Sequence, residues 1–340
     1  MGGKQMSESM QLDLFDNDVR DKDISSIDRL FHDIKRYRKC SEFKKKLEFY
    51  ANFPNLGVYN AALVEQQRPG ARLVLTAENW KDMYGRIIKP NARPVIILMP
   101  FYPVDFLFDI SDTKPIDNSR KEDRDMVIER IIHQFKATST QDTSFYMRNV
   151  KANLPKHGIY YNSHYIVGSE MQAEIRRDQS ETLEVKYYKD KTIKYHNYFT
   201  ISVNFKAEEP EQLASIFHEL GHLFCQHIVH PWCKDRSYTH EVKEFEAETV
   251  SYLVCERLGI KTHSTEYLAL YLEDNDKIPE ISLECVFQAV DLIERVATGY
   301  MNVSDCLLYK KDPIFKEMVM KEKAHAKDEE ARAKSVRPTL

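Results

Sequence analysis

Apolar positions along the chain follow two different periods. In residues 27–50 they recur every three or four positions, which predicts an amphipathic helix whose opposite face is basic and includes Lys35 and Arg36. Similar spacing predicts further helices at 78–84, 126–135, 241–258 and 283–296, and one that begins near Pro210.

Other stretches are short apolar runs bounded by Gly, Pro and polar residues. They predict strands at 73–75, 95–99, 104–109, 159–161, 182–188 and 192–204. Only residues 189–191 separate the last two runs, so we expect them to form a hairpin. Helices and strands in this mixture predict an α+β protein.

The length of 340 residues allows about two domains. Residues 1–26 are polar and acidic, and we expect a disordered arm there. A small α+β domain is expected at 27–113, a charged connector at 114–150 and a second domain at 151–305. Residues 306–340 are a charged tail that we expect to fray.

Composition restricts the class of protein only in part. The apolar content of 42% is enough for real cores, and the net charge of −4 requires any nucleic-acid-binding surface to be local. The chain has no apolar run of membrane-spanning length and no secretory pattern, so we expect a cytoplasmic protein with no membrane contact. The six scattered cysteines are expected to be reduced.

The candidate chemistry lies in residues 218–222, which read His-Glu-Leu-Gly-His. Positions i and i+4 of a helix share a face, so His218 and His222 can hold one Zn²⁺ ion between them. Glu219 is then placed to take a proton from a metal-bound water. The motif predicts a hydrolytic zinc site.

A catalytic zinc site usually has three protein ligands and one open position. The three-histidine form of the motif is excluded, because Cys225 and Ile228 occupy the positions of its glycine and third histidine. A Cys225 thiolate remains an alternative, but two carboxylates of the following helix, Glu244 and Glu248, fit better and share a face. We assign Glu244 to the zinc and Glu248 to the other ring N–H of a histidine ligand, with the reverse assignment open. Ala247 between them would let the two helices approach closely.

The sequence Glu-Phe-Glu-Ala-Glu at 244–248, after the histidine pair, resembles the ImmA/IrrE-like zinc metallopeptidases within the wider gluzincins. The similarity covers about residues 195–300, although the usual Asn or Asp at position 248 is Glu here. It implies a peptidase that acts on a protein or peptide. Tyr238, His240 and Tyr252 are candidate oxyanion donors by proximity, and the strand at 200–204 is expected to pair its edge with the substrate.

An upstream series of anchors resembles the single-stranded-DNA-binding domain of ArdC-type antirestriction proteins. Over residues 28–113 they read Asn-Phe-Pro, Tyr-Asn-Ala-Ala-Leu, Gln-Arg-Pro-Gly-Ala, Trp, Gly-Arg and Phe-Asp-Ile-Ser-Asp-Thr. ArdC-type proteins carry a metallopeptidase domain after this one, so the two resemblances support each other. The chain departs from the family at 89–91, which read Lys-Pro-Asn where relatives have Lys-Gly. The resemblance implies binding of single-stranded DNA, with contact candidates Arg68, Trp80, Arg86, Lys89 and Arg93, beside Lys35 and Arg36 of the basic helix.

A short peptide in the arm reads Gln-Leu-Asp-Leu-Phe at 11–15. It resembles the motif by which bacterial DNA-associated proteins bind the replication sliding clamp. Leu12, Leu14 and Phe15 would enter an apolar pocket while Gln11 fixes the register. The arm therefore carries a possible clamp-binding site.

Together these features give a first hypothesis and two alternatives. The first is a zinc metalloprotease coupled to single-stranded DNA, with a role in antirestriction or in protecting incoming DNA of mobile elements. The second is a DNA-binding antirestriction factor whose zinc site is structural or inactive. The third is a peptidase that cleaves one specific regulator.

Overall fold

The computed structural model describes residues 40–99, 104–116, 128–132, 142–164, 173–178, 182–188, 191–230, 238–262 and 277–335, and the single positions 126, 232, 236 and 268. Helices and strands are mixed along the chain, which confirms the α+β class. Among the described residues no helix combines the length and the apolar character needed to cross a membrane.

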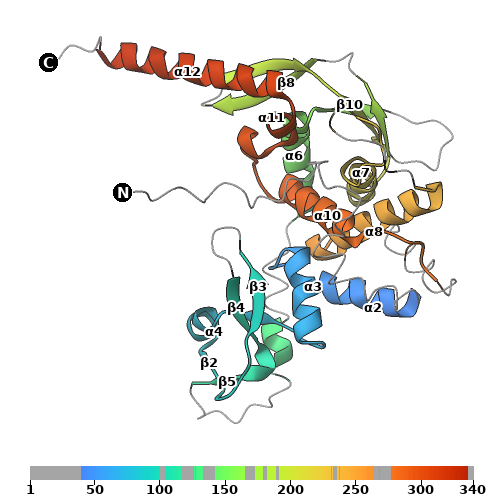
Figure 1. The fold of residues 1–340 in the computed structure, drawn as a ribbon, viewed down its shortest axis with the longest axis vertical. Helices are drawn as coiled ribbons and strands as arrows, with labels where there is room; N and C mark the ends of the chain where they lie inside the picture. The colour runs from blue at the N-terminus through green and yellow to red at the C-terminus, as the bar shows by residue number, and fades with distance from the viewer. Residues whose placement is uncertain are drawn as a thin grey trace, which may run out of the picture. The chain divides into compact units, whose positions relative to one another are not determined.

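Contacts divide the chain into two compact units. The first comprises 1–141 and 252–291, and the second comprises 142–251 and 292–340. Two long helices, α8 (His240–Leu258) and α10 (Leu283–Thr298), therefore contribute residues to both units. Figure 1 shows the elements of each unit.

The first unit begins with two helices and continues with short strands. Its elements are α2 (Cys40–Ala51), α3 (Val58–Gln67), β1 (Val74–Leu75), α4 (Ala77–Tyr84), β2 (Arg86–Ile88), β3 (Val95–Leu98), β4 (Val104–Asp109), η2 (Ile110–Asp112) and β5 (Thr113–Pro115). The strands form an antiparallel sheet in the order β1-β4-β3 and a β2-β5 pair. α4 begins where the Thr76 side chain accepts from the Asn79 N–H, and it ends at Gly85 with a φ of 58°.

The core of this unit gathers residues from well-separated segments. Trp80 of α4 packs with Leu73, Ile110, Ile128 and Ile131. The predicted connector therefore supplies two buried side chains to this core.

The C-terminal part of the first unit is held to its N-terminal helices by polar contacts. Arg257 of α8 donates to the carbonyl oxygens of Tyr50, Phe53 and Leu56, at 3.0, 3.1 and 2.6 Å. Asp291 of α10 accepts from the Val58 N–H at 3.2 Å. Backbone carbonyls in and just after the last turn of α2 thus find a hydrogen-bond donor in a side chain some two hundred positions later.

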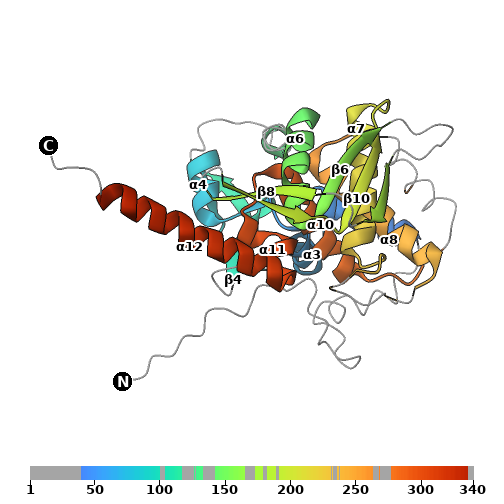
Figure 2. The same cartoon turned by 90° about the horizontal axis from the view of Figure 1, so that it is seen from above.

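The second unit contains the remaining elements. They are α6 (Thr143–Asn153), η3 (Leu154–His157), β6 (Ile159–His164), β7 (Ala173–Arg177), β8 (Thr182–Tyr188), β9 (Lys191–His196), β10 (Phe199–Asn204), α7 (Glu209–Phe224), η4 (Val303–Asp305), α11 (Leu307–Lys311) and α12 (Pro313–Ser335). β10 pairs with β6 in parallel and with β7 antiparallel, giving the order β6-β10-β7. β6 and β10 lie side by side in Figure 2, and α7 packs against β7 and β10.

Two expectations about these strands need correction. The segment 192–204 is not one strand: β9 pairs with β8 as the predicted hairpin, and β10 enters the other sheet after a break at Asn197 and Tyr198. The Asn197 side chain stabilises this break by donating to the Phe199 carbonyl at 3.1 Å. The expectation that 200–204 offers a free edge is wrong, because among the described strands β10 is central and β7 lies at the edge.

The C-terminal segment also differs from the predicted frayed tail. Residues 313–335 form α12, which begins where Asp312 accepts from the Phe315 N–H at 2.9 Å. Phe315 and Val319 are fully buried against Leu183 and Val185 of β8. Figure 1 shows α12 lying along this hairpin. The segment as a whole is rich in charged residues, so the short apolar stripe near its start was not recognised in the sequence.

Close packing of α7 on α8 fixes the geometry described below. A Cβ atom at Gly221 would lie 3.1 Å from the Ala247 Cα and 3.2 Å from its carbonyl oxygen. The Ser251 hydroxyl donates to the Ala214 carbonyl at 2.9 Å across the same interface. The small residue at 247 allows the close approach that the sequence led us to expect.

Candidate metal centre

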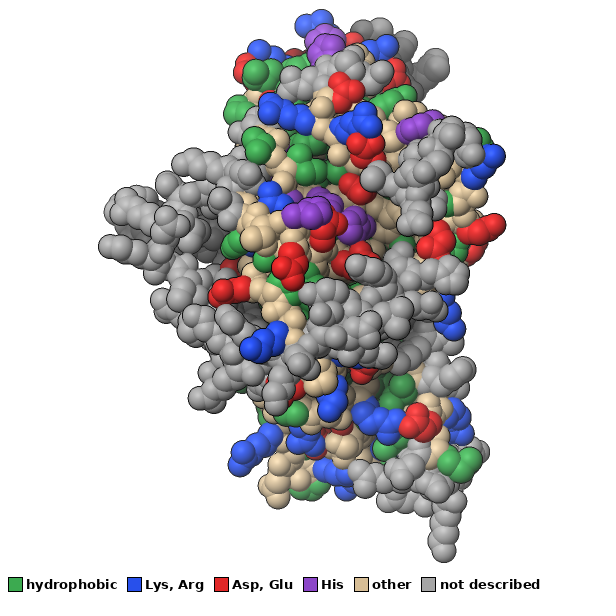
Figure 3. All heavy atoms as spheres, turned by 90° about the vertical axis from the view of Figure 1, so that its right-hand side faces the viewer, with side chains coloured by type: hydrophobic (Ala, Val, Ile, Leu, Met, Phe, Trp, Pro, Cys, Tyr) green, Lys and Arg blue, Asp and Glu red, His purple; other side chains and the backbone are tan. Residues whose placement is uncertain are grey.

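α7 presents the two histidines because of its own amphipathic pattern. The helix has Pro210 in its first turn and acidic residues beside it, which suit the positive end of the helix dipole. Its apolar stripe, including Phe217 and Leu220, is fully buried. His218 and His222 are left on a half-buried side, and on the face drawn in Figure 3 histidine side chains lie beside acidic ones.

Three side chains converge on one point. The Nε2 atoms of His218 and His222 are 3.1 Å apart. The Glu244 Oε2 atom lies 3.5 Å from His218 Nε2, and Oε1 lies 3.4 Å from His222 Nε2. Ligands about 2.1 Å from a tetrahedral zinc ion are about 3.4 Å from one another, so this donor set fits a divalent metal.

Glu248 contacts the other side of the first histidine. Its Oε2 atom lies 2.7 Å from His218 Nδ1. A carboxylate at Nδ1 fixes the ring with Nε2 free to bind a metal. The geometry thus favours Glu244 as the ligand and Glu248 as the ring partner of His218.

The carboxylates around His218 and His222 favour positive charge at this centre. Burial acts to lower the pKa of His218, but the carboxylates of Glu244 and Glu248 outweigh it and raise this pKa to about 10. The same contacts with His218 and His222 hold the pKa of Glu244 well below its usual range. These carboxylates favour positive charge at His218, as they would favour a bound cation.

Glu219 lies beside these groups on the same helix. Its Oε2 atom accepts from the Ile175 N–H of the edge strand β7 at 3.0 Å. Burial raises the pKa of Glu219, although the charges of His218 and His222 act in the opposite direction. A raised pKa makes this carboxylate a stronger base, which suits it to accept a proton.

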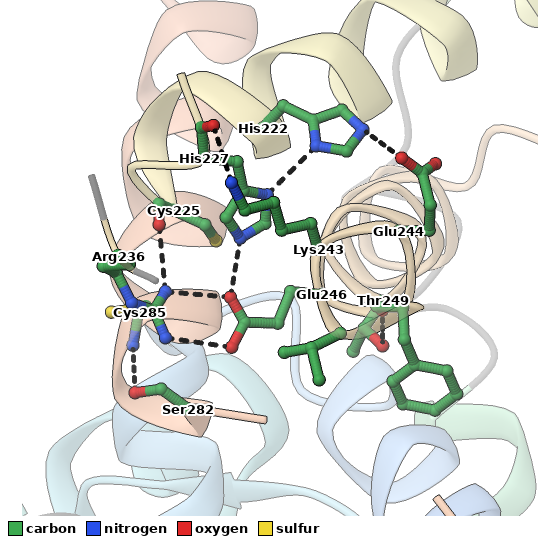
Figure 4. Close-up of polar contacts among 12 residues, drawn as sticks. His222, Cys225, His227, Arg236, Lys243, Glu244, Glu246, Thr249, Ser282 and Cys285 are labelled. Carbon is green, nitrogen blue, oxygen red and sulfur yellow. Dashed lines mark hydrogen bonds and ion pairs between the residues drawn. The ribbon is translucent and has the colours of Figure 1, made fainter. Parts of the chain in front are cut away.

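The structure also brings in residues that the sequence did not single out. The His222 Nδ1 atom lies 3.0 Å from His227 Nδ1, and His227 Nε2 lies 2.8 Å from Glu246 Oε2. Arg236 contacts both oxygens of Glu246 (Figure 4), at 2.9 and 3.1 Å. Burial lowers the pKa of His227. The sequence did carry a signal that Glu246 is buried. This residue stands between Phe245 and Ala247 in a helix that has apolar residues on more than one face.

The other predicted site residues have different surroundings. Cys225 is buried and belongs to the group with His227 and Glu246 rather than to the histidine pair. His240 is 88% exposed, with Nδ1 3.4 Å from Glu244 Oε1. Tyr238 packs against Arg236, whose guanidinium carbon lies 4.3 Å from the ring centroid. Burial raises the pKa of Tyr252, which is grouped with the first unit, to about 12.

The candidate DNA contacts divide into buried and accessible residues. Trp80 is fully buried and donates through Nε1 to the Phe108 carbonyl, which argues against the predicted stacking role. Arg86 is also buried and donates to Thr113. Arg68 pairs with Asp112, and the Lys89 ammonium donates to the Ser111 carbonyl, both half-buried; Arg93 is exposed.

Several predicted residues lie outside the described part of the chain. They are Lys35 and Arg36 of the basic helix and Gln11, Leu12, Leu14 and Phe15 of the possible clamp-binding peptide. Their assignments stay predictions.

Comparisons with known proteins do not establish a family for this chain. No family model matches the chain, and no curated protein matches it. One solved structure, of the antirestriction protein ArdC from plasmid R388 with Mn(II) bound, is similar at 14% identity over 71% of this chain and 80% of that one. The TM-score of 0.28 is too low to establish a common fold.

Proposed function

We propose that this chain is a zinc-dependent peptidase. The observation that supports this most directly is the convergence of His218, His222 and Glu244 at 3.1 to 3.5 Å, with the Glu219 carboxylate beside them. The two histidines and the glutamate fit the ligand set of a catalytic zinc site that keeps an open position. A purely structural site would not need Glu219, and this favours the enzyme over the factor with an inactive centre.

The roles of the chain's own residues follow from their positions. When bound, zinc supplies Lewis acidity that polarises a substrate carbonyl and lowers the pKa of water to about 7. Glu219 accepts the proton of the attacking water and passes it to the leaving amine. The edge of β7, whose Ile175 N–H points at Glu219, is suited to pair with an extended peptide.

Glu219→Gln tests the proposal. The amide keeps the size of the side chain but cannot accept the proton, so we expect cleavage of an unfolded protein substrate to slow by about 10²–10⁴-fold. Zinc content, measured on the same samples, should not change. Glu241→Gln, an exposed position on α8, is the control and should cleave normally. Wild-type cleavage by Glu219→Gln would contradict the assignment.

We further propose that the first unit binds single-stranded DNA, as the resemblance of residues 28–113 implies, with a role in antirestriction. The surface that supports this differs from the predicted one. Arg93 is exposed, and on the β3-β4 pair Phe106 is 49% exposed opposite Ile96 at 43%. An accessible aromatic ring suits base stacking better than the buried Trp80.

Fluorescence anisotropy with a labelled oligonucleotide tests this second proposal. Phe106→Ala and Arg93→Ala should each weaken binding several-fold, and the loss for Arg93→Ala should shrink at high salt. Lys186→Ala, an exposed lysine in β8 of the other unit, is the control. Unchanged affinity in both test variants would contradict the surface. Cleavage assays with and without the oligonucleotide separate a DNA-coupled protease from a peptidase for one regulator.

A further inference from the structure

A buried polar cluster adjoins the metal centre on the side away from Glu244. It consists of His227, Glu246 and Arg236, whose side chains are 1%, 0% and 15% exposed. Figure 4 shows the cluster reaching His222 through His227. Groups of this polarity are costly to bury unless they are fully hydrogen-bonded, so their arrangement calls for a specific role.

A second metal site is one candidate role. Ligand atoms of Cys225, His227 and Glu246 lie within 4.8 Å of one another. However, the Arg236 guanidinium already neutralises Glu246 by contacting both carboxylate oxygens. A cation would have to displace this buried pair, which is strongly unfavourable. The role of the cluster is better explained by its contact with His222 of the metal centre.

The hydrogen-bonding groups of the cluster allow one consistent assignment of protons. Glu246 can only accept, so His227 carries its proton on Nε2 and donates it to Glu246 Oε2. The His227 Nδ1 atom is then an acceptor, so His222 carries its proton on Nδ1 and donates a hydrogen bond to it at 3.0 Å. His222 is thereby left with a bare Nε2, the atom that faces Glu244 and His218.

The backbone places His227 for this contact. α7 ends in a Schellman motif: Gln226 has a φ of 62°, its N–H donates to the Leu223 carbonyl, and the His227 N–H donates to the His222 carbonyl at 2.8 Å. The turn folds the chain back over the last helical turn. His227 therefore contacts His222 through both its backbone and its ring.

We propose that His227 is a positioning residue for the metal centre. It holds His222 in the tautomer and orientation that bind metal through Nε2. Glu246 and Arg236 in turn fix the tautomer of His227. The two metal-binding histidines are thus supported differently, His218 by the carboxylate of Glu248 and His222 by a neutral ring. The inference rests on the metal centre of the proposed function, but not on peptidase activity.

Two substitutions of His227 test the proposal in the full-length protein. His227→Phe keeps an aromatic ring at this position but has no acceptor for the His222 Nδ1–H. We therefore expect zinc affinity to fall about 10- to 100-fold. His227→Gln offers an amide oxygen and should recover part of that loss. Affinity is measured by competition with a chelating dye. His230→Gln is the matched control, because His230 is another buried histidine of the same loop whose Nδ1 accepts from the Trp232 N–H.

Co²⁺ substitution supplies a readout that a general loss of stability would not change. We expect the visible absorption of the Co²⁺ protein to shift in His227→Phe, to return towards the wild-type spectrum in His227→Gln and to stay unchanged in His230→Gln. Wild-type zinc affinity and Co²⁺ spectrum in a folded His227→Phe protein would overturn the positioning role. Failure of the wild-type protein to bind zinc would overturn this role and the proposed function together, whereas zinc binding without peptide cleavage would overturn only the peptidase.

Discussion

Three carboxylates of α8, each two residues from the next, have different surroundings. Glu244 is 43% exposed and faces the Nε2 atoms of both histidines. Glu246 is completely buried against His227 and Arg236. Glu248 is 15% exposed and contacts His218 Nδ1. The helical period turns alternate residues to opposite sides, so one short stretch serves both the metal centre and the cluster behind it.

The difference between Glu244 and Glu248 predicts unequal effects on zinc binding. Glu248→Ala removes a partner of a ligand, and we expect about a 10- to 100-fold loss of affinity. Glu244→Ala removes a ligand and should cost more than Glu248→Ala. Competition with a chelating dye measures both, with Glu241→Ala as the control. A larger loss in Glu248→Ala would support the reverse assignment.

His157 predicts a pH dependence of stability. Burial lowers its pKa to about 3 from 6.5, and its Nδ1 accepts from the Leu307 N–H. Between these values the unfolded chain binds the proton and the folded chain does not. The free energy of unfolding should therefore fall as the pH falls from 6.5, by about 1.4 kcal/mol per pH unit from this group.

Urea denaturation at pH 7, 6 and 5 measures this slope. His157→Gln should be less stable at pH 7 but should show a flatter dependence on pH than the wild-type protein. His325→Gln, an exposed histidine on α12, should leave the dependence as it is. An equal slope in His157→Gln and wild type would contradict the prediction.

At the scale of elements, the contact of α7 with α8 decides whether the ligands meet. The Gly221 position faces the backbone of Ala247, which cannot move aside as a flexible side chain would. The interface thus controls the distance from the histidine pair on one helix to Glu244 on the other. Neither helix holds a complete ligand set by itself.

Gly221→Ala should separate the two helices. The added methyl group would meet the Ala247 Cα at 3.1 Å, and we expect a loss of about 1–3 kcal/mol of stability together with weaker zinc binding. Denaturation and dye competition measure the two effects. Gly299→Ala is the control, because in the described part of the chain a Cβ atom there meets nothing within 4 Å beyond its sequence neighbours. Equal behaviour of the two variants would show that the interface does not limit the site.

At the scale of the whole molecule, a metal that joins α7 to α8 links binding to folding. An ion that binds only the folded chain should stabilise it by about 2.7 kcal/mol when its free concentration is one hundred times its dissociation constant. We expect a higher melting temperature with zinc and a lower one with a chelator. Glu219→Gln should keep this response and His218→Ala should lose it. A response that survives in His218→Ala would point to zinc binding elsewhere.

The sequence by itself determined the features that depend on local spacing. His218 and His222 share a face because a helix repeats every 3.6 residues, and Glu244 and Glu248 share a face for the same reason. The hairpin of β8 and β9 followed from a short polar turn between two strands, and the α+β class followed from the mixed patterns. These inferences needed only neighbouring residues.

Only the tertiary structure decided which distant segments meet. Trp80 was a candidate for base stacking until packing buried it, and β10 was a candidate edge until β6 and β7 covered it on both sides. His227 contacts His222 because a turn after α7 folds it back, and Glu246 of the next helix joins His227 to Arg236. Burial and pairing depend on contacts between segments far apart in the chain, which the local pattern of apolar and polar positions does not record.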